Sequence, residues 1–210
     1  ETHLENTISS MQSMLKIFYQ NKGLTNDFAE DTSEEEKKQN RLPSQHLNIR
    51  YMKMFSGAFM YAAGNHIGIE WDQTRGLMLS EKVEVDDSGK ITNGQYFGWG
   101  IAHEIGHQLN QSDYTIAEVT NNYFSLLATA NGTNNGVRFS YDTIYDKVTS
   151  GAIGHSSDVF TSLAMYWQLH LAYDNAYAQK TYSNYKEITN NLLFARVDSY
   201  ARNPSSFDGE

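Results

Sequence analysis

The chain of 210 residues contains no cysteine, only two prolines and no apolar run long enough to span a membrane. Without cysteine it can form no disulfide and no thiolate metal site, so a bound zinc ion would need histidine and carboxylate ligands. Positive charge is also scarce: 16 Lys and Arg stand against 25 Asp and Glu, giving a net charge of −9. Nucleic-acid binding needs clustered Lys and Arg, so we expect no nucleic-acid partner.

The most informative segment is His103-Glu-Ile-Gly-His107, within a helical pattern over residues 99–109. In a helix, residues four apart lie on one face, so His103 and His107 can direct both imidazoles at one point. This spacing is typical of the first two ligands of a zinc site. Glu104, one step around the helix, can take a proton from a metal-activated water that attacks a carbonyl. The opposite face carries a core-facing apolar stripe formed by Ile101, Ile105 and Leu109.

Two acidic residues can supply the third protein ligand that a catalytic zinc site needs. Glu118 falls in a second helical pattern over residues 115–127, and a glutamate on a second helix packed against the first is the gluzincin arrangement. Asp113 lies ten residues after His103, where a metzincin-type pattern places a ligand. That pattern has Gly where this chain has Asn110, although Asn tolerates a left-handed turn. The spacing favours Glu118 and leaves Asp113 as the alternative.

The residues around Glu118 allow two further interpretations. Asn122 lies one turn after Glu118 and can hydrogen-bond a ligand histidine from behind. Thr115-x-x-Glu118 also matches a capping box, in which the carboxylate would instead satisfy the start of the helix.

Three pieces of the chain, in order, resemble the enhancin-type zinc metallopeptidases, which include viral enhancins and bacterial mucin-degrading enzymes. They are residues 55–69, Trp99-Gly100 followed by the His-Glu-Ile-Gly-His motif, and Glu118-Val-Thr-Asn-Asn122. The resemblance implies a gluzincin with one Zn²⁺ held by His103, His107 and Glu118, and with Glu104 as general base.

The same resemblance implies a substrate class. It places the glycan-contacting aromatic at Trp99, and Asn65 and His66 at the border of the substrate cleft. It thus implies a secreted or cell-surface enzyme that cleaves O-glycosylated, mucin-like proteins. A metzincin-like protease using Asp113, and a glycan-binding module without activity, are the alternatives. The oxyanion of the reaction could be steadied by His155, Tyr96 or Tyr114, between which the sequence does not choose.

We expect an α+β, mostly helical domain with a small sheet before the active-site helix. Residues 1–210 would form a monomeric metallopeptidase catalytic domain, a fragment of a longer chain because the β-rich region that usually precedes it in the family is not evident. Its expected parts are a helical lead-in (1–45), a strand-rich cleft edge (46–98), the zinc-binding helices (99–130) and a helical C-terminal part (131–210).

Apolar periodicity predicts the remaining elements. Helices are expected at residues 3–20, 141–148, 158–178 and 184–201, and a hairpin is expected around the turn at 86–89. Ser156 or Ser157 would cap the helix at 158–178. That helix would direct Phe160, Leu163, Trp167 and Leu171 toward the core, with His170 as a buried structural histidine.

Overall fold

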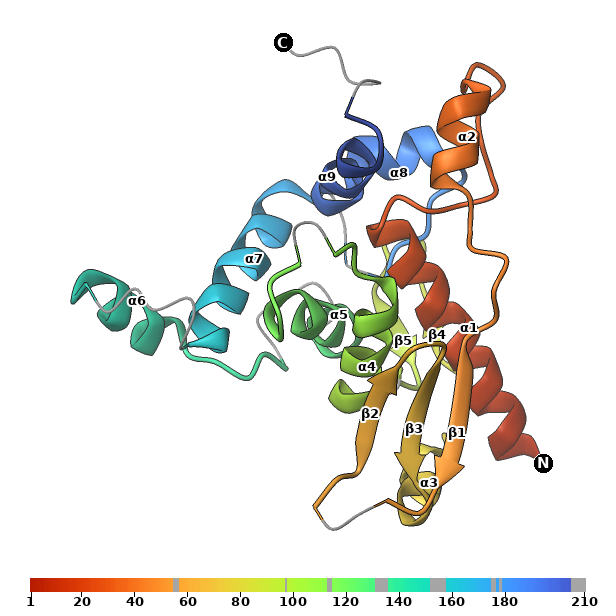
Figure 1. The fold of residues 1–210 in the computed structure, drawn as a ribbon, viewed down its shortest axis with the longest axis vertical. Helices are drawn as coiled ribbons and strands as arrows, with labels where there is room; N and C mark the ends of the chain where they lie inside the picture. Colours follow the sequence, from red (N-terminus) through yellow and green to blue (C-terminus); the bar gives the residue numbers. More distant parts are fainter. Residues whose placement is uncertain are drawn as a thin grey trace.

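The computed structural model describes residues 1–54, 57–96, 98–112, 115–130, 136–151, 158–174, 177 and 179–204. Figure 1 shows the arrangement of the helices and strands. The helices are α1 (Thr2–Asn21), α2 (Glu34–Asn40), the 3₁₀ turn η1 (Trp71–Gln73), α3 (Thr74–Leu77), α4 (Trp99–Leu109), α5 (Val119–Thr129), α6 (Tyr141–Thr149), α7 (Val159–Tyr173), α8 (Tyr185–Asn191) and α9 (Leu193–Arg202). The strands are β1 (Asn48–Met52), β2 (Met60–Ala63), β3 (His66–Glu70), β4 (Glu84–Val85) and β5 (Ile91–Asn93).

These elements confirm the expected mostly helical α+β class, with small sheets ahead of α4. The larger sheet has the strand order β1-β3-β2, with β1 parallel and β2 antiparallel to the central β3. Ile67 and Ile69 of β3 are fully buried in one core that also contains Phe18 of α1 and Ile105 of α4. The other small sheet is the β4–β5 hairpin, which forms where the turn at 86–89 was expected. Among the described residues, no helix is both long and apolar enough to cross a membrane.

The strand β2 lies at an edge of the larger sheet, beside the helix α4 (Figure 1). The ring of Tyr61 in β2 lies next to Gly68 of β3, its partner in the sheet. A Cβ at Gly68 would stand 2.2 Å from this ring. The glycine in β3 therefore permits a close side-chain approach, as glycines inside strands often do. The Tyr61 hydroxyl also lies 2.9 Å from Nε2 of His66, which ties the two strands together.

The helices α4 and α5 pack against each other at close range. Residues Val119 to Ala128 of α5 are all buried, so this helix is enclosed on every side. At the contact, a Cβ at Gly106 would lie 2.9 Å from Cα of Asn121 and 3.0 Å from Cδ2 of Phe124. Only a residue without a side chain fits there, so Gly106 sets how closely the two helices approach.

The C-terminal helices differ from expectation in three ways. The helix predicted at 184–201 is two helices, because the chain is extended at Leu192 and the N–H of Leu193 bonds Oδ1 of Asp174 instead of continuing the helix. The predicted helix 158–178 ends at Tyr173 and is capped by Asp158, whose carboxylate accepts the Thr161 N–H at 3.1 Å. Leu163 and Trp167 are buried as predicted, but the prediction was wrong for Phe160 and Leu171, which are exposed. The α7 helix is apolar on most sides, so periodicity could not identify its buried face.

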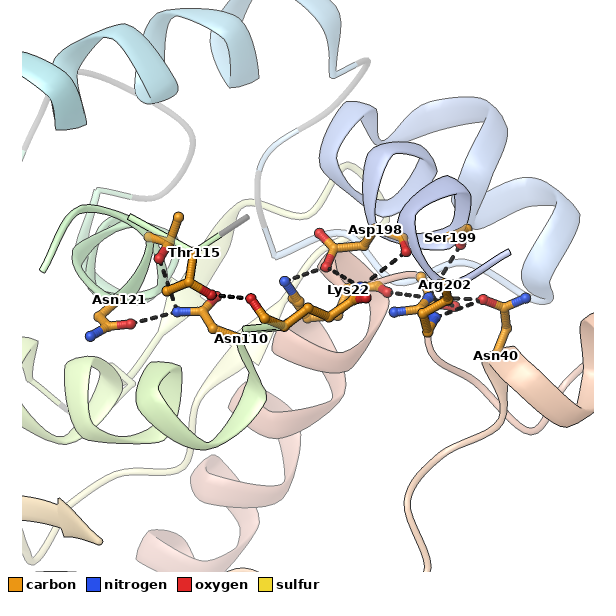
Figure 2. Close-up of polar contacts among 11 residues, drawn as sticks. Lys22, Asn40, Asn110, Thr115, Asn121, Asp198, Ser199 and Arg202 are labelled. Carbon is orange, nitrogen blue, oxygen red and sulfur yellow. Dashed lines mark hydrogen bonds and ion pairs between the residues drawn. The ribbon is translucent and has the colours of Figure 1, made fainter. Parts of the chain in front are cut away.

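A buried ion pair joins the end of α1 to α9 (Figure 2). The Lys22 ammonium contacts the Asp198 carboxylate, and both side chains are almost fully buried. Asp198 also accepts two hydrogen bonds from Nε2 of Gln111, at 2.9 Å to Oδ1 and 3.0 Å to the backbone oxygen. Arg202 donates to the carbonyl of Lys22 at 2.6 Å and to Oδ1 of Asn40. The segment that follows α4 is thus anchored to the C-terminal helix.

Replacing Lys22 by Met should cost about 3–5 kcal/mol of unfolding free energy, because it leaves the Asp198 carboxylate buried without its counter-ion. The double variant Lys22→Met/Asp198→Asn should lose less unfolding free energy than Lys22→Met, because no charge is left buried at position 198. Lys186→Met, which breaks the exposed pair with Asp31, is the control and should cost at most about 1 kcal/mol. Urea unfolding measures all three, and equal losses for Lys22→Met and Lys186→Met would contradict the account.

Gly106→Ala should destabilise the protein by about 1–3 kcal/mol, because the added methyl group forces α4 and α5 apart. Gly76→Ala is the matched control, since a Cβ there meets no described atom within 4 Å. Thermal unfolding of the two variants compares them, and a Gly106→Ala protein as stable as the control would disprove the close contact.

Candidate metal centre

The helix α4 presents both histidines of the motif on one face. The rings of His103 and His107 stand edge to face with centroids 4.9 Å apart. The His103 side chain is 16% exposed and that of His107 is 38% exposed, so the pair opens to solvent on the side of His107. Ile101 and Ile105, on the far side of the helix, are buried in the core. The helix is therefore amphipathic, as its sequence predicts.

Glu118 completes a group of three donors. Its Oε2 lies 3.2 Å from Nε2 of His103 and its Oε1 lies 3.7 Å from Nε2 of His107. One donor atom from each of the three residues lies within 4.8 Å of the others. Two imidazole nitrogens and one carboxylate oxygen are the donor set of a catalytic zinc site that keeps a position open. The residues present therefore fit the metal that the sequence predicts.

The backbone at Glu118 is unusual. Its φ angle is +64°, and it is the one non-glycine residue with positive φ in the described part of the chain. The helix α5 begins at Val119, with Glu118 as its N-cap and without a capping bond from its side chain. The capping-box interpretation of Thr115 and Glu118 is therefore wrong. A left-handed conformation costs a non-glycine residue free energy, and such strain is commonly found at functional sites. Here it accompanies a carboxylate turned toward both histidines.

Asn122 lies behind His103. Its Oδ1 is 2.8 Å from Nδ1 of His103 and 2.9 Å from the indole nitrogen of Trp99. An amide oxygen can only accept, so the proton of the neutral His103 ring is held on Nδ1. Nε2 then keeps its lone pair on the side of Glu118. Asn122 thus occupies the supporting position that its spacing from Glu118 indicated.

Trp99 makes a contact that sequence reasoning did not anticipate. Its indole N–H is used inside the protein to orient Asn122, and its carbonyl accepts a hydrogen bond from Ser125 at 2.9 Å. The guanidinium of Arg138 lies over the ring, 4.4 Å from its centroid. Trp99 therefore supports His103 indirectly, through Asn122.

Glu104 is half-buried between α4 and the edge strand β2. Desolvation raises the pKa of its carboxyl above the ordinary glutamate value, and the charge of Glu118 adds to the rise. His103, His107 and a hydrogen bond from the backbone of Ala62 in β2 act in the opposite direction and lower this pKa. A carboxyl whose pKa is raised toward neutrality is suited to accept and later return a proton.

Asn121 was missed by sequence reasoning. It is buried at the α4–α5 contact, and its Nδ2 lies 2.8 Å from Nδ1 and 3.0 Å from Nε2 of His107. The available signal was a pair of adjacent asparagines in a helix that is otherwise enclosed by the core. Unpaired polar groups are costly there, so each amide must have a partner.

The other described candidate residues are not part of the group of three donors. Asn65 is exposed in the turn between β2 and β3, where its carbonyl accepts a bond from Asn48, and His66 bonds Tyr61 within the sheet. Tyr96, a candidate oxyanion donor, is 5% exposed in the main core, and burial raises its pKa to about 12. Asp113, Tyr114 and His155 lie outside the described residues, as do Ser156 and Ser157.

Comparison with known proteins assigns the chain to a family. The family model for peptidase M60, enhancin and enhancin-like, matches residues 11–193. The chain belongs to this family. Comparisons with curated proteins and with solved structures found no match. The resemblance carried by three sequence segments is thus confirmed over most of the chain, and membership makes the protein a metallopeptidase of the M60 family.

Glu118→Gly and Glu118→Ala remove the same carboxylate, but only the glycine variant also relieves the left-handed backbone. Both should lose most of their zinc affinity. In chelator, without metal, the glycine variant should be more stable than the alanine variant by about 1 kcal/mol. Urea unfolding measures this difference, and an alanine variant at least as stable as the glycine variant would refute the strain at position 118.

Proposed function

We propose that this M60 metallopeptidase is a secreted or cell-surface zinc endopeptidase that hydrolyses O-glycosylated, mucin-like proteins. The observation that carries the proposal is the convergence of His103, His107 and Glu118, with Glu104 beside them on the same helix. The two histidines and Glu104 come from α4, and Glu118 comes from the start of α5. The edge strand β2 adds the backbone of Ala62, which bonds Glu104.

His103, His107 and Glu118 would hold one zinc ion. Zinc in such a site lowers the pKa of a coordinated water to about 7 and polarises a carbonyl. Asn122 fixes the proton of His103 on Nδ1 and so leaves Nε2 free for the metal. Glu118 is favoured over Asp113 because its carboxylate already lies within 3.7 Å of both histidines.

Glu104 would act as the general base. It would take the proton of the attacking water and return it to the leaving amine, and both transfers are most efficient when the pKa of the carboxyl lies near the working pH. The raised pKa of Glu104 supports this role, and the Ala62 N–H holds the carboxylate between α4 and β2. Binding of peptide in the site would remove more water from Glu104 and raise its pKa further.

The strand β2 would hold the substrate backbone. The N–H of Glu70 donates to the carbonyl of Phe59 at 2.9 Å, and in an antiparallel ladder alternate residues make these bonds. Phe59 and Tyr61 therefore turn their backbone groups to β3, while Met60 and Ala62 turn theirs to the other edge, where the Ala62 N–H bonds Glu104 and its carbonyl would meet the substrate. An extended peptide can add to such an edge as a further strand. Ala62 would then link the substrate strand to Glu104.

The glycan requirement rests on the sequence resemblance to mucin-degrading enzymes. Trp99 stands one turn before His103, close enough for its ring or the stacked Arg138 to meet a sugar next to the scissile bond. Asn65 and His66 would contribute to substrate binding at the turn that joins β2 to β3.

Glu104→Gln should bind zinc as tightly as wild type and reduce peptide hydrolysis by at least about 100-fold, since it keeps the shape but not the base. Because burial raises the pKa of Glu104, its ionised form costs folding free energy at neutral pH, and the neutral variant should be at least as stable as wild type. Zinc titration, peptide cleavage rates and thermal unfolding measure the three properties. Cleavage at the wild-type rate would eliminate Glu104 as the base.

Mass spectrometry of two Ser/Thr-rich peptides tests the substrate class. One peptide carries O-linked N-acetylgalactosamine, the other is bare, and Glu104→Gln is the control. Cleavage of the glycosylated peptide alone is the expected result. Cleavage of both would indicate a general protease, and zinc binding without cleavage of either would favour a glycan-binding module.

A further inference from the structure

An aromatic ring, that of Phe59, is exposed beside the strand that would hold the substrate. Phe59 directly precedes β2 and is 57% exposed. Its backbone continues the pairing of the sheet, because its carbonyl accepts the N–H of Glu70 at 2.9 Å. Its ring reaches the helix α4, since a Cβ on Gly100 would lie 3.7 Å from Cε2 of Phe59. The backbone of Phe59 thus belongs to the sheet, while its ring lies against the helix that carries both histidines.

The described contacts around this ring are apolar. Gly98 and Gly100 lie on either side of Trp99 at the start of α4. A Cβ at Gly100 would stand 3.0 Å from Sδ of Met60, so the thioether of Met60 lies on the same stretch of helix as the Phe59 ring. A Cβ at Gly98 would meet no described atom within 4 Å, which leaves the start of α4 accessible. The ring is therefore neighboured by a thioether and by glycine backbone.

Glu70, the last residue of β3, holds the chain on both sides of the ring. Its N–H donates to the carbonyl of Phe59, and its carboxylate accepts the N–H of Met54. Glu70 also pairs with Met52, the last residue of β1. The segment that enters β2 is thus attached to one residue at Met54 and at Phe59, so the Phe59 ring is carried by a fixed backbone.

The ring lies about one helical turn from the proposed general base. Gly100 and Glu104 are four residues apart, so they share a face of α4 and lie about 6 Å apart along its axis. Phe59 lies at the first of these positions, and the Ala62 N–H bonds the second residue. An extended peptide advances about 3.3 Å per residue. A peptide added along β2 would therefore meet Phe59 about two residues from the bond that is cut.

The chemistry of this position favours an apolar partner. A single exposed apolar residue is common on protein surfaces and needs no explanation by itself, but Phe59 stands where the substrate strand would pass. Its ring has no hydrogen-bonding group, and the neighbouring Met60 can adapt its shape to what packs on it. An apolar substrate side chain would remove apolar area of both partners from water. A sugar, with its hydroxyl groups, would gain less from these neighbours.

We propose that Phe59 is a specificity-determining residue that selects an apolar substrate side chain, such as Phe, Leu or Met, about two residues from the scissile bond. This inference rests on the proposed function, because it needs a peptide bound along β2. It adds a preference in peptide sequence to the glycan contacts proposed for Trp99 and Arg138. Glu70 is a positioning residue that acts through Phe59.

A set of glycosylated Ser/Thr-rich peptides tests this subsite. In each peptide one Phe replaces an Ala at one of the positions within three residues of the cleaved bond, on either side. For wild type we expect Phe two residues from the bond, on one side, to raise kcat/KM about 10-fold over Ala. The gain should lie mainly in KM, because the contact is made in the ground state and the transition state alike. Phe59→Ala should bring the Phe-to-Ala ratio of kcat/KM close to 1, and Phe59→Leu should retain part of the preference.

Two sets of variants control the result. Tyr145→Ala removes another exposed aromatic, 69% exposed on α6 and away from α4 (Figure 1), and should keep the wild-type ratio. Glu70→Ala should lower the ratio by releasing the chain at Met54. Glu70→Gln should restore it, because the amide oxygen can still accept the Met54 N–H. A merely structural role of Glu70 would change the overall rate without changing the ratio.

The outcomes separate the subsite from the proposed function. A wild type without preference at any scanned position, or a Phe59→Ala protein with the wild-type ratio, would overturn the subsite. If Phe59→Ala instead lost only the preference for glycosylated over bare peptide, the ring would contact the sugar, which also overturns it. A wild type that cleaves no peptide would refute the proposed function. The zinc-loaded Glu104→Gln protein then decides the subsite, and equal Kd values for the Phe and Ala peptides, or no binding of either, would overturn it.

Discussion

The site depends above all on the close contact between α4 and α5. In the sequence Gly106 lies between His103 and His107, and a Cβ there would collide with the backbone of Asn121. The absence of a side chain at this one position brings α5 near enough for Asn121 and Asn122 to stand behind His107 and His103. The same contact brings the start of α5, with Glu118, over the imidazoles. The glycine of the motif is therefore as necessary to the geometry as the histidines.

The segment that connects α4 to α5 is subject to a second constraint, at Glu118. Glu118 must begin a buried helix and at the same time direct its carboxylate back at α4. A left-handed residue at the N-cap accomplishes both, at a cost in backbone free energy that the rest of the fold must offset. The anchor of Gln111 on Asp198, and of Asp198 on Lys22, ties the segment after α4 to the first and last helices. The helix α9 thus supports, through Asp198 and Gln111, the segment that connects the two helices of the site.

Much of this arrangement could be predicted from the sequence because it follows from periodicity. The spacing of His103, Glu104 and His107 fixes one helical face, and the interval from Glu118 to Asn122 is one turn. The left-handed backbone at Glu118 could not be predicted, since the pattern from Thr115 equally fits a capped helix that starts earlier. The contact of Asn121 with His107 depends on how two helices cross. The break at Leu192 and the exposed face of α7 likewise depend on tertiary neighbours, which local patterns do not contain.

We propose that His103, His107 and Glu118 form one zinc site on the α4–α5 pair. The most direct test is anomalous diffraction at the zinc edge from crystals of the zinc-loaded protein. We expect a single strong peak between the two Nε2 atoms and the Glu118 carboxylate, at bonding distances of about 2.0–2.2 Å. A peak bound by Asp113 instead of Glu118, or no peak near His103 and His107, would contradict it.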